Sequence, residues 1–320
     1  MKKRIILLLI FLLMVASSCS KEKTSTTIEK ELTIATPSGA PLFAVSSFVE
    51  SKNISVINDT STIPSYFLNQ EYDFIVAPTN VGCIQYKKGN TNYKLAGTIT
   101  WGNLYFASFN QDFDEISDLN NIDLVAFGNK TINQSLVEFV LQKSGVSIEK
   151  IENIEWVADA STTRQLLLSD TSGQKVYLCA EPTLTQAKVS SKSLGNINTL
   201  SVTKLYNELL NSTNNYIYTQ ASLFVSTKTL NDNEKEVKDF LNLCNSSLDK
   251  IEEKTSTIAT TLSSLGVNMK EEIVKTALPN CNIKYKDANY TKEALEKLID
   301  NLGTTYFSGE KPVDDFYYKY

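Results

Sequence analysis

Short apolar runs alternate with helix-length amphipathic stretches through the first two hundred residues, and this alternation most constrains the fold. Strand-type runs occur in a first series at 31–37, 54–59, 72–78, 93–100 and 103–109, in a second at 122–128, 154–159, 175–182 and 198–203, and again at 222–227. Helical spacing separates most of them. A β-α-β-α order predicts mostly parallel, doubly wound sheets. Two such series and a returning strand predict an α/β chain with two lobes and a cleft between them.

The rest of the chain has a helical pattern. Helices are expected near 231–251, 255–265, 270–278 and 291–302, followed by the aromatic tail VDDFYYKY. Because the strand at 222–227 returns after the second series, we assign residues 31–108 and 222–320 to the first lobe and residues 109–221 to the second. The tail is expected either to pack on a lobe or to fray.

The residues that follow each strand are the candidate site, because open α/β sheets bind ligands at the carboxyl ends of their strands. In the stretch TPSGAPLF, Gly39 permits a close backbone approach and Pro41 suits the first turn of a helix. The same reasoning along the chain selects twelve positions for ligand binding: Ser38, Gly39, Thr60, Thr79, Asn80, Trp101, Thr131, Asn133, Asp159, Ser161, Glu181 and Gln220.

Several of these residues also have an ordinary structural interpretation. Trp101 could stack on a flat ligand or pack in the core, and Thr131 could cap a helix as well as receive a polar ligand group. Glu181 could accept from a ligand amine, bond between the lobes, or belong to a simple turn. Asp59 and Asp159 are strand-end carboxylates with the same alternatives.

The N-terminus predicts export and lipidation. A basic start precedes the apolar residues 5–15, a stretch too short to cross a bilayer but suitable for a signal-peptide core. ASSC then ends at Cys19, as in a lipobox at which the signal is removed and the cysteine is lipidated. Polar residues 20–30 suit a flexible tether. Ordinary cleavage beside an incidental Cys19 and an uncleaved anchor are the alternatives.

Composition excludes several function classes. The net charge of −5 gives no electrostatic footprint for nucleic acid, and the absence of histidine removes the usual Ser-His-Asp and Cys-His catalysis and the commonest zinc ligand. Apart from Cys19, four cysteines remain without CxxC spacing: Cys83, Cys179, Cys244 and Cys281. Two disulfides are possible in an exported protein, but we expect most of these residues to be small buried side chains.

An ordered set of motifs resembles one protein family. The motifs are ASSC, IATPSGAPLFAV, YDFIVAPTNVG, AGTITWGNLYFAS, VAFG before a capped helix, and LCAEPTL. In this order they resemble the solute-binding lipoproteins of ABC importers, in the branch that includes nitrate-, sulfonate- and pyrimidine-precursor-binding proteins. The resemblance implies a type II periplasmic-binding-protein clamp, each lobe a mixed sheet with flanking helices, without catalysis or cofactor.

The expected function is therefore capture of a small solute between the lobes and its delivery to separate permease and ATPase subunits. The expected protein is a monomer held on the outer face of the membrane. One later arginine, Arg164, and several acidic candidates favour an aromatic, amine-bearing or zwitterionic solute over nitrate or sulfonate. A hydrolase using carboxylates among Asp59, Asp159 and Glu181, and an adhesion or scaffold lipoprotein, are the alternatives.

Replacing Cys19 by Ala tests the anchor. We expect the variant to be released from the membrane or to remain unprocessed, because the lipid acceptor is lost. Membrane fractionation and the mass of the mature chain measure both outcomes. A variant that stays membrane-bound and normally processed would show that the lipobox interpretation is wrong.

Overall fold

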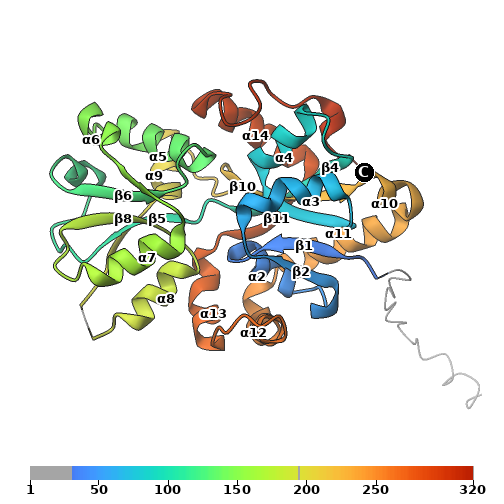
Figure 1. Cartoon of the computed structure of the whole chain (residues 1–320), viewed down its shortest axis with the longest axis horizontal. Coiled ribbons are helices and arrows are strands. Elements are labelled where there is room, and N and C mark those ends of the chain that lie inside the picture. The colour runs from blue at the N-terminus through green and yellow to red at the C-terminus, as the bar shows by residue number, and fades with distance from the viewer. Residues whose placement is uncertain (1–30, 194, 320) are drawn as a thin grey trace, which may run out of the picture.

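The computed structural model describes residues 31–193 and 195–319, which form two α/β lobes beside each other (Figure 1). The first sheet has six strands in the order β11 (Ile283–Asp287), β4 (Tyr93–Trp101), β10 (Thr219–Ser226), β3 (Phe74–Pro78), β1 (Ile34–Pro37) and β2 (Ile54–Ile57). The second has five, in the order β7 (Glu155–Val157), β6 (Asp123–Phe127), β8 (Lys175–Ala180), β5 (Leu104–Ser108) and β9 (Asn198–Ser201). The proposed leader, Cys19 and the tether lie outside the described residues.

Both sheets are mixed, as predicted. β1 is parallel to β2 and β3, whereas β10 is antiparallel to both β3 and β4. In the second sheet β6 is parallel to β7 and β8, and β5 is antiparallel to β8 and β9. β4 therefore runs in the same direction as β1 and β3, which brings their carboxyl ends to one edge of the first sheet.

Helices flank both sheets. Those of the first lobe are α2 (Ala40–Ser46), α3 (Ile63–Asn69), α4 (Thr79–Lys87), α10 (Thr227–Asp232), α11 (Glu234–Leu248), α12 (Thr255–Ser264), α13 (Glu271–Ala277) and α14 (Ala288–Leu302). Those of the second are α5 (Ile132–Lys143), α6 (Ile148–Glu152), α7 (Ala160–Ser169), α8 (Thr183–Ser190) and α9 (Val202–Leu209). Short 3-10 turns lie at Ser51–Asn53, Thr60–Thr62, Ile116–Asn120, Ile251–Lys254, Leu278–Asn280 and Asp314–Phe316. No helix of the described residues is long and apolar enough to span a bilayer.

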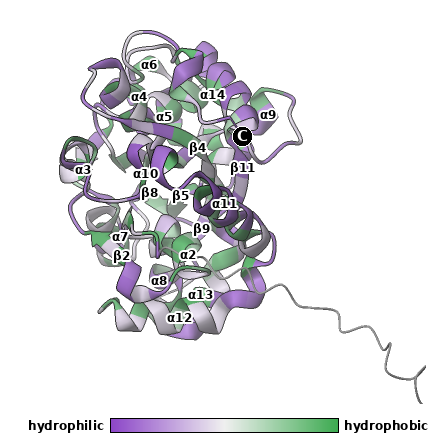
Figure 2. Cartoon of the chain, turned by 90° about the vertical axis from the view of Figure 1, so that its right-hand side faces the viewer, coloured by the Kyte–Doolittle hydropathy of each residue, from purple (hydrophilic) through white to green (hydrophobic). Residues whose placement is uncertain are grey.

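The central strands are buried on both faces, which explains their nearly continuous apolar sequence. On β3, Phe74 and Val76 belong to the apolar cluster on one face of the sheet, and Ile75 and Ala77 to the cluster on the other. The covering helices are amphipathic, as the mixed hydropathy of α11 shows (Figure 2). The first sheet is therefore a central layer with an apolar cluster of side chains packed on each of its faces.

Two predicted assignments are wrong. β5 pairs in the second sheet, so the chain leaves the first lobe at Gly102, whereas the predicted boundary was residue 108. The chain returns to the first lobe before β10 begins at Thr219, whereas the predicted boundary was residue 221. β11 was predicted as part of a helical region, yet Ile283 and Tyr285 are buried, and Lys284 and Lys286, which alternate with them, are half-buried. This short alternation fits a strand, but its charged residues and helical neighbours concealed it.

The cysteines of the described residues are buried free thiols, as expected for most of them. Burial raises their pKa values, for example that of Cys179 to about 12. A neutral thiol in an apolar site behaves as a small hydrophobic side chain.

The aromatic tail packs on the first lobe. Phe316 is fully buried, with its ring 5.1 Å from that of Tyr86 on α4 and 6.0 Å from that of Phe224 on β10. Ion pairs hold the adjacent acidic residues, with Lys94 Nζ 2.6 Å from Asp315 Oδ1 and Lys292 bound to Asp314. The tail therefore completes the apolar layer over α4 and β10.

Truncating Phe316 to Ala should destabilise the first lobe by about 3–5 kcal/mol, the usual cost of emptying a buried aromatic site. Denaturant unfolding measures the difference. Val313→Ala is the matched control, because Val313 is 58% exposed in the same segment. Equal unfolding free energies for the two variants would contradict this packing.

Candidate functional site

The carboxyl edges of the two sheets face each other across a very short connection. β4 ends at Trp101 and β5 begins at Leu104, so only two residues separate the sheets. Leu104 pairs with Ala180 at the end of β8, and Trp101 pairs with Thr219 at the start of β10. Strand-end residues from both lobes therefore meet around this crossing.

The chain passes between the lobes twice, at Gly102 and Asn103 and again just before β10, and these two crossings are hydrogen-bonded to each other. Gly102 N donates to Tyr218 O at 3.1 Å, and Asn103 N donates to Gln220 Oε1 at 3.2 Å. Thr203 Oγ1 donates to Gly102 O at 2.8 Å. A Cβ at position 102 would lie 2.3 Å from Thr203 Oγ1 and 2.6 Å from Tyr218 Cδ1, so only glycine fits here.

Glu181 is a buried carboxylate at this junction. It is 4% exposed, and its Oε2 and Oε1 accept from Thr185 N and Thr185 Oγ1, both at 3.0 Å. Its backbone is bonded in both directions to Asn103, through Glu181 N to Asn103 O at 3.1 Å and Asn103 Nδ2 to Glu181 O at 3.0 Å. Burial raises the pKa of Glu181, which the Thr185 bonds and Lys188 oppose. In the described part of the chain Glu181 forms no ion pair.

Two buried carboxamides at the junction keep an oxygen without a donor. Asn80 Nδ2 donates to Tyr306 O at 3.1 Å, but Asn80 Oδ1 has no partner among the described residues. Asn103 Oδ1 is likewise unpaired within the described ranges. Tyr306 also donates from its hydroxyl to Gln134 Oε1 at 3.4 Å, which places Asn80 where the C-terminal segment meets α5 of the second lobe. Buried polar atoms are normally hydrogen-bonded, so each exception requires an explanation.

Sequence reasoning missed Asn103. It was placed inside a strand because the predicted strand-end segment stopped at Gly102. The signal that could have found it is the polar side chain directly after Trp101-Gly102, where an apolar run changes lobe.

Gly39 and Asn133 also lie at contacts between the lobes. Gly39 has a φ of 91°, and a Cβ there would be 3.9 Å from Pro182 Cδ, so the start of α2 approaches the start of α8. Asn133 Oδ1 accepts from Tyr218 OH at 3.0 Å, which joins α5 to the segment that returns to the first lobe. Ser38 is exposed beside Gly39.

Trp101 does not present its ring to the junction, so the predicted stacking on a ligand is not supported. Its side chain is fully buried, and its indole N–H donates to Lys284 O at 2.8 Å. The rings of Tyr216 and Tyr290 pack edge-on at 5.7 and 5.8 Å. The pairing of β4 with β11, which sequence reasoning did not anticipate, turns this residue into the core of the first lobe.

Other predicted residues complete local structure. Thr79 Oγ1 lies 2.8 Å from Ser222 Oγ in a buried hydroxyl cluster. Thr131 caps α5, accepting from Asn133 N at 3.2 Å and donating to Gly128 O at 2.6 Å. Thr60 and Ser161 are exposed in the first turns of their helices.

The three candidate carboxylates each bind the start of the helix that follows them. Asp59 Oδ1 accepts from Ser61 N at 2.9 Å, and Asp159 Oδ1 from Thr162 N at 2.8 Å. The Ser61 hydrogen bonds lower the pKa of Asp59. These are capping roles, in contrast to the catalytic pair that a hydrolase requires. No group of three or more His, Cys, Asp or Glu suited to a metal ion occurs in the described residues.

Arg164 lies on α7 and forms no ion pair within the part of the chain that the structure describes; its Nε is buried there without an acceptor. Its position at the second turn of α7 leaves a planar donor group available for a bound acceptor.

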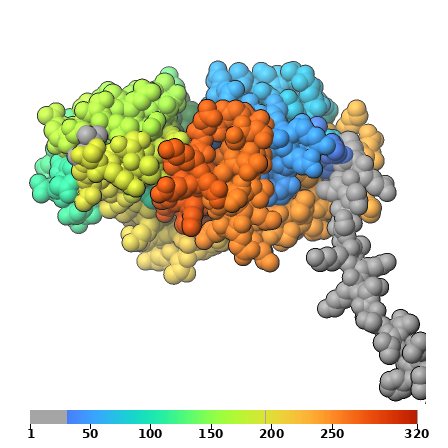
Figure 3. Space-filling model, turned by 90° about the horizontal axis from the view of Figure 1, so that it is seen from below, coloured from blue at the N-terminus to red at the C-terminus, as the bar shows by residue number. Residues whose placement is uncertain are grey.

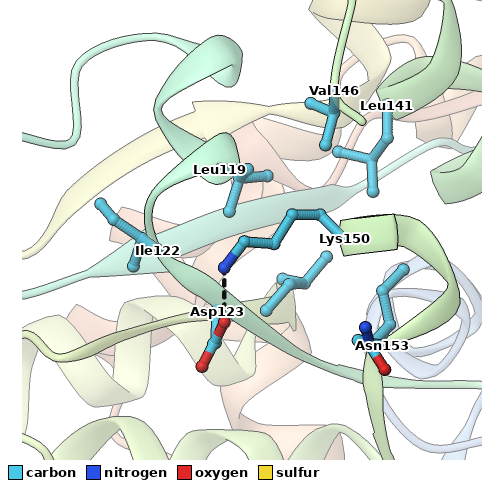
Figure 4. Close-up of a pocket in the computed structure, with 9 residues that line it drawn as sticks. Leu119, Ile122, Asp123, Leu141, Val146, Lys150 and Asn153 are labelled. Carbon is cyan, nitrogen blue, oxygen red and sulfur yellow. Dashed lines mark hydrogen bonds and ion pairs between the residues drawn. The ribbon is translucent and has the colours of Figure 1, made fainter. Parts of the chain in front are cut away.

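Two hollows of the second lobe lie at the edge of its sheet where β6 and β8 begin, opposite the carboxyl edge that faces the first lobe. One of about 10 Å³ is lined by Asp123, whose Oδ1 lies 2.8 Å from Lys150 Nζ (Figure 4). Another of about 350 Å³ includes Asp170 and Lys175. Asp123 and Lys175 begin β6 and β8, so both hollows are remote from the strand ends. The first hollow holds at most about one water. In the second, Asp170 Oδ2 accepts a hydrogen bond from Lys175 N, and the Lys175 ammonium forms an ion pair with Glu155.

The lobes also touch on two sides of the junction. Below it, α13 packs against α8, and Tyr105 OH donates to Asn280 O at 3.2 Å (Figure 3). Elsewhere Asn301 Nδ2 on α14 donates to Tyr206 OH on α9 at 3.0 Å. Contacts between the lobes therefore lie on both sides of the crossing.

No protein-family model matches the sequence, and no curated protein matches it. Solved structures do match. An ABC transporter structure from Parabacteroides distasonis is 18% identical with a TM-score of 0.72, covering 91% of this chain and 99% of that chain. The ligand-binding component of an ABC-type import system from Staphylococcus aureus, with zinc bound, is 11% identical with a TM-score of 0.65, covering 90% and 96%. The alkanesulfonate-binding protein SsuA from Xanthomonas axonopodis pv. citri, bound to MOPS, is 13% identical with a TM-score of 0.62, covering 90% and 97%.

These matches span nearly the whole length of both chains and both lobes. They confirm the predicted two-lobed architecture. This chain has the fold of the substrate-binding proteins of ABC transporters.

Proposed function

We infer that this protein captures a small solute between its lobes and delivers it to the permease of an ABC importer. The observation that supports this best is the set of buried acceptors at the lobe junction, where Asn103 Oδ1, whose residue is bonded to the buried Glu181, and Asn80 Oδ1 both lack donors among the described residues. A bound solute would supply the missing hydrogen bonds. Among the structural neighbours named above are an ABC transporter structure, the ligand-binding component of an ABC-type import system and an alkanesulfonate-binding protein, which favours the same function.

The expected solute is aromatic, amine-bearing or zwitterionic. Acceptors predominate at the junction, and Arg164 Nε is a buried donor without an acceptor. The aromatic wall proposed at Trp101 is replaced by Tyr105, which lies half-buried at the lobe contact. The junction residues among the predicted twelve that we retain as ligand-binding candidates are Ser38, Gly39, Asn80, Asn133, Glu181 and Gln220, and we add Asn103.

The compartment and partners follow from the sequence. Residues 5–15 and the ASSC motif support export and lipidation at Cys19, with the body of the protein outside the membrane. The permease and ATPase would be separate chains. A lipid anchor would keep a monomeric receptor close to its permease.

An enzyme is less well supported. Glu181, Asp59 and Asp159 each bind the start of their own helix, and an acid-base pair requires two carboxylates flanking one bond. An adhesion or scaffold function would leave the buried, unpaired acceptors unexplained.

A screen of small metabolites by thermal unfolding tests the function, with scattering as the second measurement. A bound solute should raise the melting temperature and reduce the radius of gyration, because it draws the lobes together. Recovering the solute unchanged distinguishes a receptor from an enzyme. Failure of every solute to stabilise the protein would argue for a scaffold.

Gly102→Ala should impair closure. The added methyl would clash with Thr203 and Tyr218, and overpacking of this kind costs about 1–3 kcal/mol. We expect weaker binding of any stabilising solute and a smaller change in radius of gyration. Gly145→Ala is the control: its φ is +81°, but its methyl would meet nothing within 4 Å. Similar binding by both variants would show that the crossing does not govern closure.

A further inference from the structure

The lobe junction combines a buried carboxylate with unpaired acceptors, and this combination indicates a chemical class of ligand. We propose that the site takes a solute with a protonated, hydrogen-bearing amine that binds next to Glu181 and donates to the carboxamide oxygens of Asn80 and Asn103. This proposal rests on the proposed solute-binding function and narrows it.

The first step concerns charge. Glu181 is 4% exposed, and no lysine or arginine of the described residues forms an ion pair with it. Lys188, the basic group on the helix that follows Glu181, donates instead to Thr199 Oγ1 at 3.2 Å. The other titratable groups that interact with Glu181 are Tyr105, Cys179 and Cys281, and burial raises the pKa of each, which keeps them neutral. A buried carboxylate needs a cation or a proton, and Lys188 acts on Glu181 only from a distance, so no cation among the described residues is bonded to this carboxylate.

The second step concerns hydrogen-bonding capacity. Each oxygen of Glu181 accepts one bond from Thr185 and can accept another. The amide nitrogens of Asn80 and Asn103 each donate a bond, to Tyr306 O and Glu181 O, whereas the amide oxygens of both residues are buried and accept none from the described residues. An ammonium group carries three donors and no acceptor, which complements this set.

The third step places these acceptors together. Asn103 bonds directly to the Glu181 backbone. Asn80 follows β3, and β3 pairs with β10 through Pro78 and Ala221, next to the Gln220 side chain that holds Asn103 N. All three residues therefore lie along the facing carboxyl edges, with Asn80 on the first lobe and Glu181 on the second.

Four related probes test the charge and the N–H requirement by thermal unfolding and calorimetry of the full mature protein. Ethanolamine has the ammonium alone, taurine has an ammonium and a sulfonate, choline is a cation without N–H, and ethanesulfonate is an anion without an amine. We expect binding of ethanolamine or taurine, and at least tenfold weaker binding of choline and ethanesulfonate.

Glu181→Gln tests the carboxylate itself. Gln can keep both bonds to Thr185 by accepting from its N–H and donating to its hydroxyl, so the fold should be retained. The ligand-free variant should melt at the same or a higher temperature, because an uncompensated buried charge is removed, while affinity for the amine probe falls at least tenfold. Asp159→Asn is the control, since Asp159 is an exposed cap and Asn caps equally well; it should change affinity less than threefold. Asn80→Leu provides a second variant if Glu181→Gln does not fold, and it should also weaken amine binding.

The outcomes separate this proposal from the general function. Binding of ethanesulfonate without ethanolamine or taurine would overturn the amine class and leave solute binding intact. Equal amine affinity for Glu181→Gln and the parent would overturn the role of the carboxylate. No stabilisation by these probes or by any metabolite of the wider screen would overturn both.

Discussion

The backbone bond between Gly102 and Tyr218 joins the two crossings of the chain, and the arrangement of the lobes depends on it. Only two residues connect β4 to β5, so the sheets cannot separate at this point. A connection this short still permits one lobe to rotate relative to the other about Gly102 and Asn103, as the lobes of a clamp do. The same short connection turns the carboxyl edge of the first sheet towards that of the second. A single close approach, possible only because residue 102 has no side chain, thus fixes how the two carboxyl edges face each other.

The sequence was sufficient to predict two α/β lobes, because the patterns that mark strands and helix starts are local and recur along the chain. Strands such as β3 are apolar on both faces, and turns with Gly39 or Thr131 mark the helices that follow. The signals failed where pairing with distant residues decides the outcome. β11 has too few apolar residues to be recognised, yet it covers β4 and determines that Trp101 is core. The boundary error at β5 has the same origin, since sheet membership depends on the partner strand.

The strand-end rule selected the edges of the two sheets that face each other, but it did not distinguish residues that complete local structure from residues left with unpaired atoms. Polar side chains after a strand compete for two uses: capping the next helix or facing the other lobe. Asp159 and Thr131 satisfy nearby backbone N–H groups, so their position at a strand end is explained without a ligand. The nitrogens of Asn80 and Asn103 each donate a bond while the oxygens accept none from the described residues, and this distinction requires the three-dimensional contacts. Capping geometry therefore separates structural candidates from functional ones.

If the lobes close on a solute as proposed, the unpaired acceptors at their junction give a physical reason for this closure. Leaving one buried acceptor without a donor costs about 1–3 kcal/mol, so the ligand-free junction is penalised when the lobes approach. A solute that donates to Asn80 on the first lobe and to the Asn103–Glu181 pair on the second removes this penalty only while the lobes are together. Its affinity is then greater for the closed arrangement than for the open one, and a ligand can shift a conformational equilibrium only through such a difference. The acceptors that select the solute would thus also be the ones that report its presence to a transport partner.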